Sequence, residues 1–189
     1  MHSSRYFLLF LLCFFFSSIH AQDVGQKRRH SVSYFNGLTF VPNSAAINAE
    51  DDTVNIELNE RQHVPCFGFV YQYNFNHKWS MGGFVEFELS RYYISDDGVP
   101  LARENIFVVG IPFYFEPFQH FEVFVAPAYE FERHKNLAVV RFGLEYDLYI
   151  ANDWWIAPEV VFDLKEKYFN YAFAIKLKKT FGKVIHAEH

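Results

Sequence analysis

Acidic and basic residues that recur at a spacing of two are the residues of this chain best suited to chemistry. Glu86 and Glu88 show this spacing, and so do Lys176 and Lys178. Two residues so spaced lie on one face of a β-strand, because successive side chains point to opposite faces. The residues predicted to share such a face are Arg141, Asp163, Glu86, Glu88, Glu122, Glu130, Glu132, Glu145, Asp147, Glu159, Lys176 and Lys178. Because carboxylates outnumber bases, the set either builds a salt-bridged core or holds protons or a cation.

One base of this set, Arg141, has a predictable partner. If residues 151–153 form a three-residue turn, the strands on either side place Arg141 directly across from Asp163. The planar guanidinium of arginine can bridge two carboxylates, and Glu130 lies diagonally across the preceding strand. We therefore expect Arg141 to pair with both Asp163 and Glu130.

The same register brings two like charges together. Glu145 lies opposite Glu159, and carboxylates so placed repel each other unless a cation lies between them. Lys176, on the following strand, is the expected cation. The pattern therefore predicts a lysine shared by two glutamates.

No known catalytic motif is present in the sequence. It has no G-x-S-x-G, no H-E-x-x-H and no glycine-rich phosphate loop. The nearest candidate is His30-Ser31 with Ser33, but alternation turns the two serines inward. The other histidines lack the spacing of metal ligands. We expect no catalytic residue, cofactor or metal site, and a packing role for Cys66.

The charged groups must be positioned by β-strands, since large apolar residues alternate with polar or small ones through most of the chain. In residues 79–92, Trp79 and Phe87 fall on one face, and Glu86 and Glu88 fall on the other. Segments of this kind are predicted at residues 31–41, 65–75, 79–92, 105–115, 121–132, 137–149, 154–164 and 169–181. The pattern indicates an all-β fold, an eight-stranded antiparallel up-and-down barrel.

The first 21 residues differ in composition from the rest. Arg5 is followed by an unbroken apolar run at residues 7–16 and by a small, polar stretch that ends at Ala21. This is the layout of a cleavable secretory signal peptide. We expect one domain at residues 22–189, with a short tail at 182–189.

The composition of the chain after the leader limits which folds and partners are possible. Without the leader, Cys66 is the one cysteine left, so no internal disulfide can form. The net charge of −5 argues against a nucleic-acid partner, and no apolar window is long enough for a membrane-spanning helix. Hydrophobic residues nevertheless make up 51% of the chain and aromatic residues 21%. These side chains need an apolar environment.

Side-chain volume decides which face of the strands points inward. The interior of an eight-stranded barrel is just wide enough for side chains to fill. The apolar face is nearly all large residues, whereas the other face mixes charges with small residues such as Gly68, Ala126 and Gly143. Aromatic residues also gather at strand ends, as in the girdles of transmembrane barrels. We therefore expect the apolar face outside; the alternative is a soluble barrel with inverted faces.

With these features the chain resembles the small eight-stranded outer-membrane barrels of the OmpX and OmpA transmembrane-domain type, over residues 22–181. The resemblance implies an outer-membrane location, periplasmic termini and short periplasmic turns. It places the longer loops, at residues 42–62 and 95–103, outside the cell. It also implies contact with outer-membrane lipid and lipopolysaccharide, and insertion by the barrel-assembly machinery. Phe181 matches the aromatic end of the family's last strand.

Three prolines depart from the strand pattern. Pro112, Pro127 and Pro158 lie inside predicted strands, where each forfeits a ladder hydrogen bond. Backbone groups in a membrane need partners, so we expect bulges or lumen water at these positions.

Two functions compete for a barrel of this kind. The first is a non-catalytic platform, with a lumen plugged by side chains and outer loops, chiefly residues 42–62, that contact a partner protein, a surface or a ligand. The second is a lipid-modifying enzyme with an outward polar cluster. Outward mid-strand positions are almost bare of nucleophiles and bases, which favours the platform. A soluble periplasmic binding barrel is the remaining alternative.

Overall fold

The computed structural model describes residues 27–46, 60–96, 99–166 and 168–185, and their regular structure is all β. The strands are β1 (Arg28–Ala46), β2 (Glu60–Asn74), β3 (Trp79–Asp96), β4 (Val99–Gly110), β5 (Phe113–Phe118), β6 (Phe121–Phe131), β7 (Leu137–Tyr146), β8 (Leu148–Ala151), β9 (Trp154–Lys165) and β10 (Phe169–Val184). Within these ranges no helix is long and apolar enough to cross a membrane. The predicted signal peptide, residues 1–21, lies outside the described residues.

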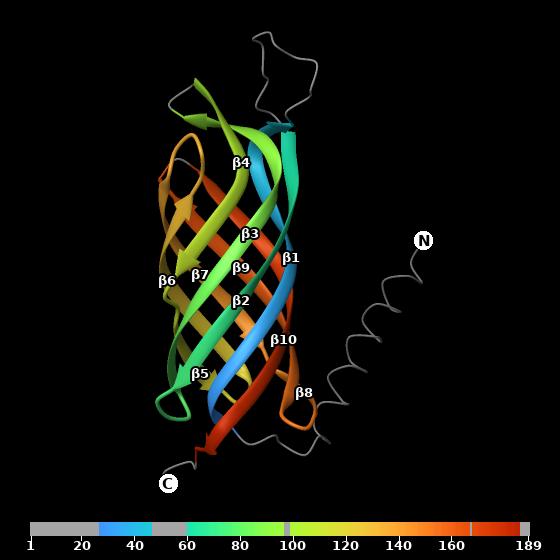
Figure 1. Ribbon diagram of the computed structural model, residues 1–189, viewed down its shortest axis with the longest axis vertical. Helices are drawn as coiled ribbons and strands as arrows, with labels where there is room; N and C mark the ends of the chain where they lie inside the picture. The colour runs from blue at the N-terminus through green and yellow to red at the C-terminus, as the bar shows by residue number, and fades with distance from the viewer. Residues whose placement is uncertain (1–26, 47–59, 97–98, 167, 186–189) are drawn as a thin grey trace, which may run out of the picture.

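These segments form one closed antiparallel barrel of eight strands (Figure 1). Neighbours in the chain pair with each other, and β10 closes the ring by pairing with both β9 and β1. β4 and β5 act as one barrel strand, since both pair with β3 and with β6. β7 and β8 do the same along β9. The eight-stranded up-and-down barrel predicted from the sequence is the observed fold.

The prolines coincide with the two places where a barrel strand is interrupted. Pro112 lies between β4 and β5, so the break expected there is present. Next to this break, the Ile111 N–H donates to the carbonyl of Pro127 on β6 at 3.1 Å. The backbone N and C=O of one residue in an antiparallel strand point to the same side, so the nitrogen of Pro127, which has no hydrogen to donate, also faces the break. Pro158 on β9 is next to Glu159, whose pairing with Glu145 is the last between β7 and β9. β6 and β9 keep their register through Pro127 and Pro158, so the bulges expected in those strands do not form.

The inward face is narrow, and glycine makes room on it for aromatic rings. A Cβ on Gly68 would lie 2.1 Å from the carbonyl oxygen of Val85 and 2.5 Å from the ring of Phe35. A Cβ on Gly143 would lie 2.6 Å from the ring of Phe124. Both rings are buried in the lumen. The small inward residues therefore fit the limited volume of an eight-stranded interior.

The outward face is a continuous apolar surface. Burial alternates along most of the strands, and in β7 buried and exposed residues follow in turn from Leu137 to Glu145. Phenylalanine rings on adjacent strands meet in a row: Phe67 and Phe87 have centroids 5.3 Å apart, and Phe87 and Phe107 have centroids 4.9 Å apart. Such cross-strand aromatic contacts stabilise the sheet and leave one side of each ring exposed. The large apolar side chains thus point outward, as the volume argument predicted.

The strands extend further than predicted at the end away from the chain termini. β1 and β2 include residues 42–46 and 60–62 of the predicted loop at residues 42–62, and the other loop residues, 47–59, lie outside the described structure. β3 and β4 likewise include most of the predicted loop at 95–103. Pairing of Ser44 on β1 with Ile94 on β3 continues the sheet in this region. We call this the loop end of the barrel, and the opposite end the turn end.

Both ends of the described chain lie at the turn end (Figure 1). Arg28 of β1 pairs with Val184 of β10, so part of the predicted tail at residues 182–189 is strand. A register shift separates this pair from the regular ladder that begins at His30. Gly182 lies at this irregularity with a φ of 86°, which glycine adopts without strain. The last strand therefore runs beyond Phe181.

Candidate functional site

Ion pairs fill the lumen in three layers, and the middle layer is centred on Arg141 of β7. Arg141 pairs in register with Asp163 of β9, as predicted. Its Nε and Nη2 donate to the two oxygens of Asp163 at 2.7 and 2.9 Å. Its Nη1 donates to Glu86 of β3, and its guanidinium carbon lies 4.6 Å from the ring centroid of Phe84. One buried base thus serves two buried carboxylates.

Glu130, the second partner predicted for Arg141, belongs to a different layer. Its carboxylate accepts a hydrogen bond from Arg103 of β4 and pairs with Lys165 of β9. Arg141 contacts Glu86 instead, which projects from the opposite wall of the lumen. The register between β6 and β7 places Ala126 opposite Arg141 and Glu130 opposite Leu137, so Glu130 is not the diagonal neighbour that was expected. The expected Arg141 to Glu130 pair is therefore wrong.

Arg103 and Lys165 form the loop-end layer, and neither base was predicted from the sequence to lie in the lumen. Lys165 continues the inward alternation two residues after Asp163, but its position beside a charged run suggested a turn. Arg103 would fall on the outward face if alternation along β4 were strict. A register shift against β3 accompanies Asn105, whose φ is 50°, and beyond it the inward positions of β4 change parity. Alternation alone could have found Lys165 but not Arg103.

These two bases lie among three carboxylates. Lys165 Nζ is 3.6 Å from Glu88 and also pairs with Glu130. Arg103 donates to Glu130 and, at 3.3 Å, to Glu132. The described part of the lumen therefore holds five bases, two more than the alternation predicted. The predicted excess of carboxylates is correspondingly smaller.

Glu132 lies in the turn after β6 and organises it. Its Oε2 accepts hydrogen bonds from the backbone N–H groups of His134 and Lys135 at 2.7 and 3.2 Å, and its Oε1 lies 2.8 Å from His134 Nδ1. Burial acts to raise the pKa of Glu132, but these hydrogen bonds and the charge of Arg103 outweigh it and hold the pKa below its usual value. The residue predicted as a lumen acid thus also closes the β6–β7 turn.

The turn-end layer begins with the shared lysine. Glu145 and Glu159 pair in register on β7 and β9. Lys176 of β10 places its Nζ 2.7 Å from Glu145 and 2.9 Å from Glu159. This arrangement offsets the repulsion that two facing carboxylates would otherwise cause.

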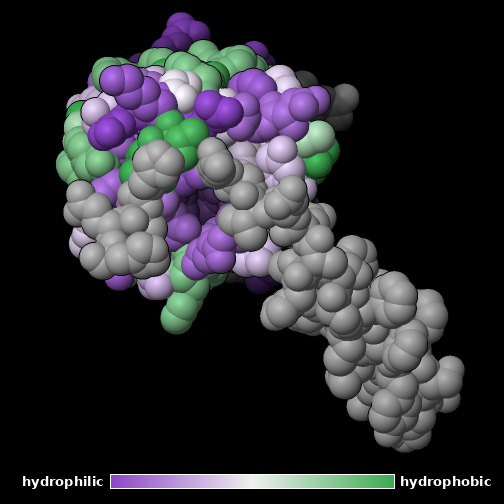
Figure 2. Space-filling model, turned by 90° about the horizontal axis from the view of Figure 1, so that it is seen from below, coloured by the Kyte–Doolittle hydropathy of each residue, from purple (hydrophilic) through white to green (hydrophobic). Residues whose placement is uncertain are grey.

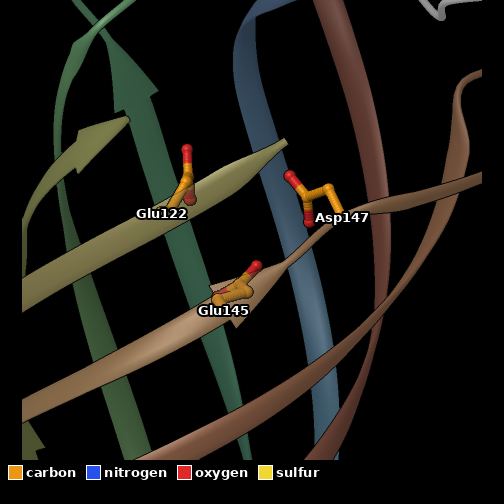
Figure 3. A group of neighbouring side chains, drawn as sticks. All are labelled: Glu122, Glu145 and Asp147. Atoms are coloured by element: carbon orange, nitrogen blue, oxygen red, sulfur yellow. The ribbon is translucent and has the colours of Figure 1, made fainter. Parts of the chain in front are cut away.

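Next to this lysine, three carboxylates lie close together (Figure 3). Oxygens of Glu122, Glu145 and Asp147 lie within 4.8 Å of one another, close enough to share a metal ion. Lys178 Nζ stands among them, 2.7 Å from Asp147, 2.5 Å from Glu145 and 3.7 Å from Glu122. The chain therefore supplies its own cation to this group.

Beyond the last layer, the lumen widens into a cavity of about 270 Å³ at the turn end. Figure 2 shows hydrophilic residues around this hollow. Its lining includes Lys27, His77, Glu116, Trp155 and Lys178. A second cavity, between the Arg141 and Lys176 layers, has a volume of only about 20 Å³. That is room for one water molecule, so the side chains themselves fill the middle of the lumen.

The solved structures similar in shape to this chain include two outer-membrane proteins. Ail, the attachment invasion locus protein of Yersinia pestis, aligns with a TM-score of 0.47 and 11% identity over 80% of this chain and 99% of its own. Outer membrane protein AlkL, determined in DMPC lipid bilayers, aligns with a TM-score of 0.46 and 11% identity over 89% and 97% of the two chains. Neither assigns a residue role here. No protein-family model and no curated protein matches the chain.

The remaining candidates from the sequence do not form a reactive group. Ser31 and Ser33 are buried on the inward face. His30 points outward, where its Nδ1 lies 2.8 Å from the hydroxyl of Tyr71. Histidine and serines are thus on opposite faces of β1 and cannot act as a base and nucleophile pair. Cys66 is a free, buried thiol, which fits a packing role.

Proposed function

We propose that this protein resides in an outer membrane and serves as a non-catalytic platform that presents the loop end of its barrel. The observation that carries the proposal is the reversed placement of side chains. Apolar groups such as Phe69, Phe173 and Leu89 are 50 to 54% exposed on the outside, while Glu86 and Arg141 are at most 5% exposed inside. Lipid is the environment that suits this surface.

The size of the apolar surface argues against the soluble alternative. A soluble monomer rarely exposes a contiguous apolar patch larger than a few hundred Å². Here the exposed large hydrophobic residues come from every strand around the wall except β4. Outer-membrane lipid and lipopolysaccharide are the partners that such a band would contact, and barrel-assembly machinery would insert it.

The platform role is supported by how the barrel is built at its loop end. The strands continue past the loop-end ion layer, and the exposed Arg91 on β3 pairs with Glu104 on β4 there. A closed wall with a filled interior holds this end rigid, which suits a surface that contacts a partner or ligand. The connection between β1 and β2, residues 47–59, is the longest segment that this end would present.

Membrane residence is tested by extraction and gel mobility. We expect the protein to leave the membrane fraction only with detergent, and the unheated protein to migrate differently from the boiled protein on a denaturing gel, because a closed ladder resists unfolding. The control is the same chain with Phe173→Asp and Ile175→Asp, which places charges on the lipid face. Recovery of the unaltered chain from the soluble fraction without detergent would refute the proposal.

The enzyme alternative needs its own experiment. A lipid-modifying enzyme would change the acyl chains of the host's lipid A, whereas a platform leaves them unchanged. Mass spectrometry of lipid A from cells with and without the protein separates the two. We expect identical spectra, and an added or missing acyl chain would reverse our choice.

A further inference from the structure

Basic side chains gather at the turn end of the barrel, where β1 and β10 meet. They are Arg29 on β1 and Lys179 and Lys183 on β10. Lys179 pairs in register with Val32 of β1. A Cβ on Gly182 would lie 3.6 Å from the Cβ of Arg29, so Lys183, the next residue of β10, is close to Arg29 in space. We call Arg29, Lys179 and Lys183 the seam patch.

Aromatic rings hold two of these bases against the outside of the wall. The Nζ of Lys179 lies 5.4 Å from the ring centroid of Trp154, and the guanidinium carbon of Arg29 lies 5.8 Å from that of Tyr73. Trp154 is 41% exposed on the outward face. Each base also donates one hydrogen bond to a backbone carbonyl of a neighbouring turn. Since lysine has three N–H donors and arginine five, both have donors left for a further acceptor.

The seam patch pairs with no carboxylate of the described residues. Two acids lie at the same rim, and both are already used: Glu116 binds Lys27, and Asp153 accepts a hydrogen bond from Arg28 at 2.7 Å. The carboxylates of the turn-end layer are buried in the lumen with bases of their own. The patch is therefore positively charged at neutral pH without a counter-charge in the described part of the chain.

The patch also lies where the apolar surface of the barrel ends. Trp154 and Phe181 are the exposed rings next to it, and Phe181 stacks on the ring of His30 at a centroid distance of 5.4 Å. In transmembrane barrels such rings mark the boundary between hydrocarbon and lipid head groups. Bases at this boundary keep their apolar stems against the rings and place their charges among the head groups. The acidic group found there is the lipid phosphate, which arginine and lysine bind well.

We propose that the seam patch binds the phosphate of an anionic phospholipid in the membrane leaflet around the turn end. A head group without a positive charge, as in phosphatidylglycerol, supplies the counter-charge that the patch lacks, whereas a zwitterionic lipid brings both signs. Each base near an anionic lipid surface contributes about fivefold in affinity. The proposal rests on the membrane residence proposed above and does not depend on the platform role of the loop end.

Trp154 can report which lipid lies next to the patch, because it contacts Lys179 and faces outward. The full chain with Trp79→Phe keeps Trp154 as its one outward tryptophan, since Trp155 is buried in the lumen. This chain is reconstituted in phosphatidylcholine vesicles. Phosphatidylglycerol or phosphatidylcholine that carries a nitroxide near the carbonyl end of one acyl chain is then added, and quenching of the tryptophan fluorescence is measured. We expect a preference of at least about tenfold for phosphatidylglycerol.

Matched variants separate the patch from the general charge of the protein. Arg29→Gln and Lys183→Gln should each lower the preference about fivefold, while Lys179 is left in place because it contacts the reporter. Arg61→Gln removes an exposed base of β2 at the loop end and should leave the preference unchanged. Gel mobility verifies that each variant folds. Added salt should weaken the preference of the unaltered patch, because the attraction is ionic.

The possible outcomes distinguish this proposal from membrane residence. No quenching by either lipid would refute both. Quenching of equal strength by the two lipids would show a barrel in the bilayer and refute the seam patch alone, leaving its bases to an acidic partner outside the membrane. A preference that survives Arg29→Gln and Lys183→Gln together, or that falls equally in Arg61→Gln, would also overturn the assignment.

Discussion

Single residues decide how the lumen tolerates so many buried charges. Arg141 is held by two carboxylates from different parts of the wall, Asp163 on the neighbouring strand and Glu86 across the lumen. A buried ion costs several kcal/mol unless it is paired and hydrogen-bonded. Replacing Arg141 therefore leaves two buried carboxylates, those of Asp163 and Glu86, without their partner. Lys176 and Lys178 both pair with Glu145, so the loss of one of these lysines leaves Glu145 with a cation.

We expect Arg141→Met to lower the free energy of unfolding by about 3 to 5 kcal/mol, the range for breaking a buried pair and leaving its partner uncompensated. The double variant with Asp163→Asn should cost clearly less than the sum of the two single variants. Unfolding in urea, in detergent micelles, measures all three. As a control, Glu130→Gln should be additive with Arg141→Met, because Glu130 pairs with Arg103 and Lys165. Additivity with Asp163→Asn would contradict the pairing.

His120 should give the barrel a specific sensitivity to acid. Burial lowers its pKa; the charge of Glu116 opposes this, and the charges of Lys27 and Lys178 add to it. A histidine with a lowered folded pKa contributes stability that is present above its unfolded pKa of about 6.5 and is lost as pH falls through the folded value. His120→Asn removes this group and suits the φ of 67° at that position. Between about pH 7.5 and 5, the urea midpoint should fall more for the unaltered chain than for the variant. Parallel pH dependence of the two would disprove the assignment.

At the scale of the element, alternation predicted where strands lie and which way they face, and it failed where the backbone departs from it. Arg103 was not predicted to point inward, because the irregularity at Asn105 changes which residues of β4 face the lumen. Glu86 was recognised as a lumen acid, but its partner was not, since that contact depends on how the sheet closes on itself. Arg141 lies opposite Asp163 as predicted, but the expected three-residue turn at 151–153 is wrong. Ala151 pairs with Trp154 across a two-residue turn, and the register shift between Tyr149 and Ala151 restores the predicted offset.

Gly82 and Gly83 of β3 provide a direct test of the inward and outward assignment. A Cβ on Gly82 would lie 2.2 Å from the carbonyl oxygen of Tyr71, whereas a Cβ on Gly83 would meet nothing within 4 Å. We expect Gly82→Ala to lower the free energy of unfolding by about 1 to 3 kcal/mol, because backbone cannot move aside easily. Gly83→Ala should leave it unchanged or raise it by about 0.4 to 1 kcal/mol. Urea unfolding of both variants measures the difference, and equal effects would contradict the facing of β3.

At the scale of the whole molecule, the side chains of the three ion layers block the lumen of the barrel. Arg141 spans the lumen at mid-height, and the cavity beside it has room for one water molecule. We therefore expect no stepwise ion current when the purified protein is added to a planar lipid bilayer. An open porin added to the same bilayer provides the positive control. Regular, voltage-independent openings by this protein would show that the layers do not block the lumen.

The seam between β1 and β10 has a consequence for how the molecule is made. It joins residues at opposite ends of the chain, from Arg28 with Val184 to Phe40 with Tyr171. The loop that must close to form it is almost the entire polypeptide, and contacts of such sequence separation slow folding. Until the final strand has been synthesised, β1 and β9 each present an unpaired edge, which is the feature that promotes pairing with other chains. The barrel can thus close only after β10 has been synthesised, and the unfinished chain depends on protection from aggregation until then.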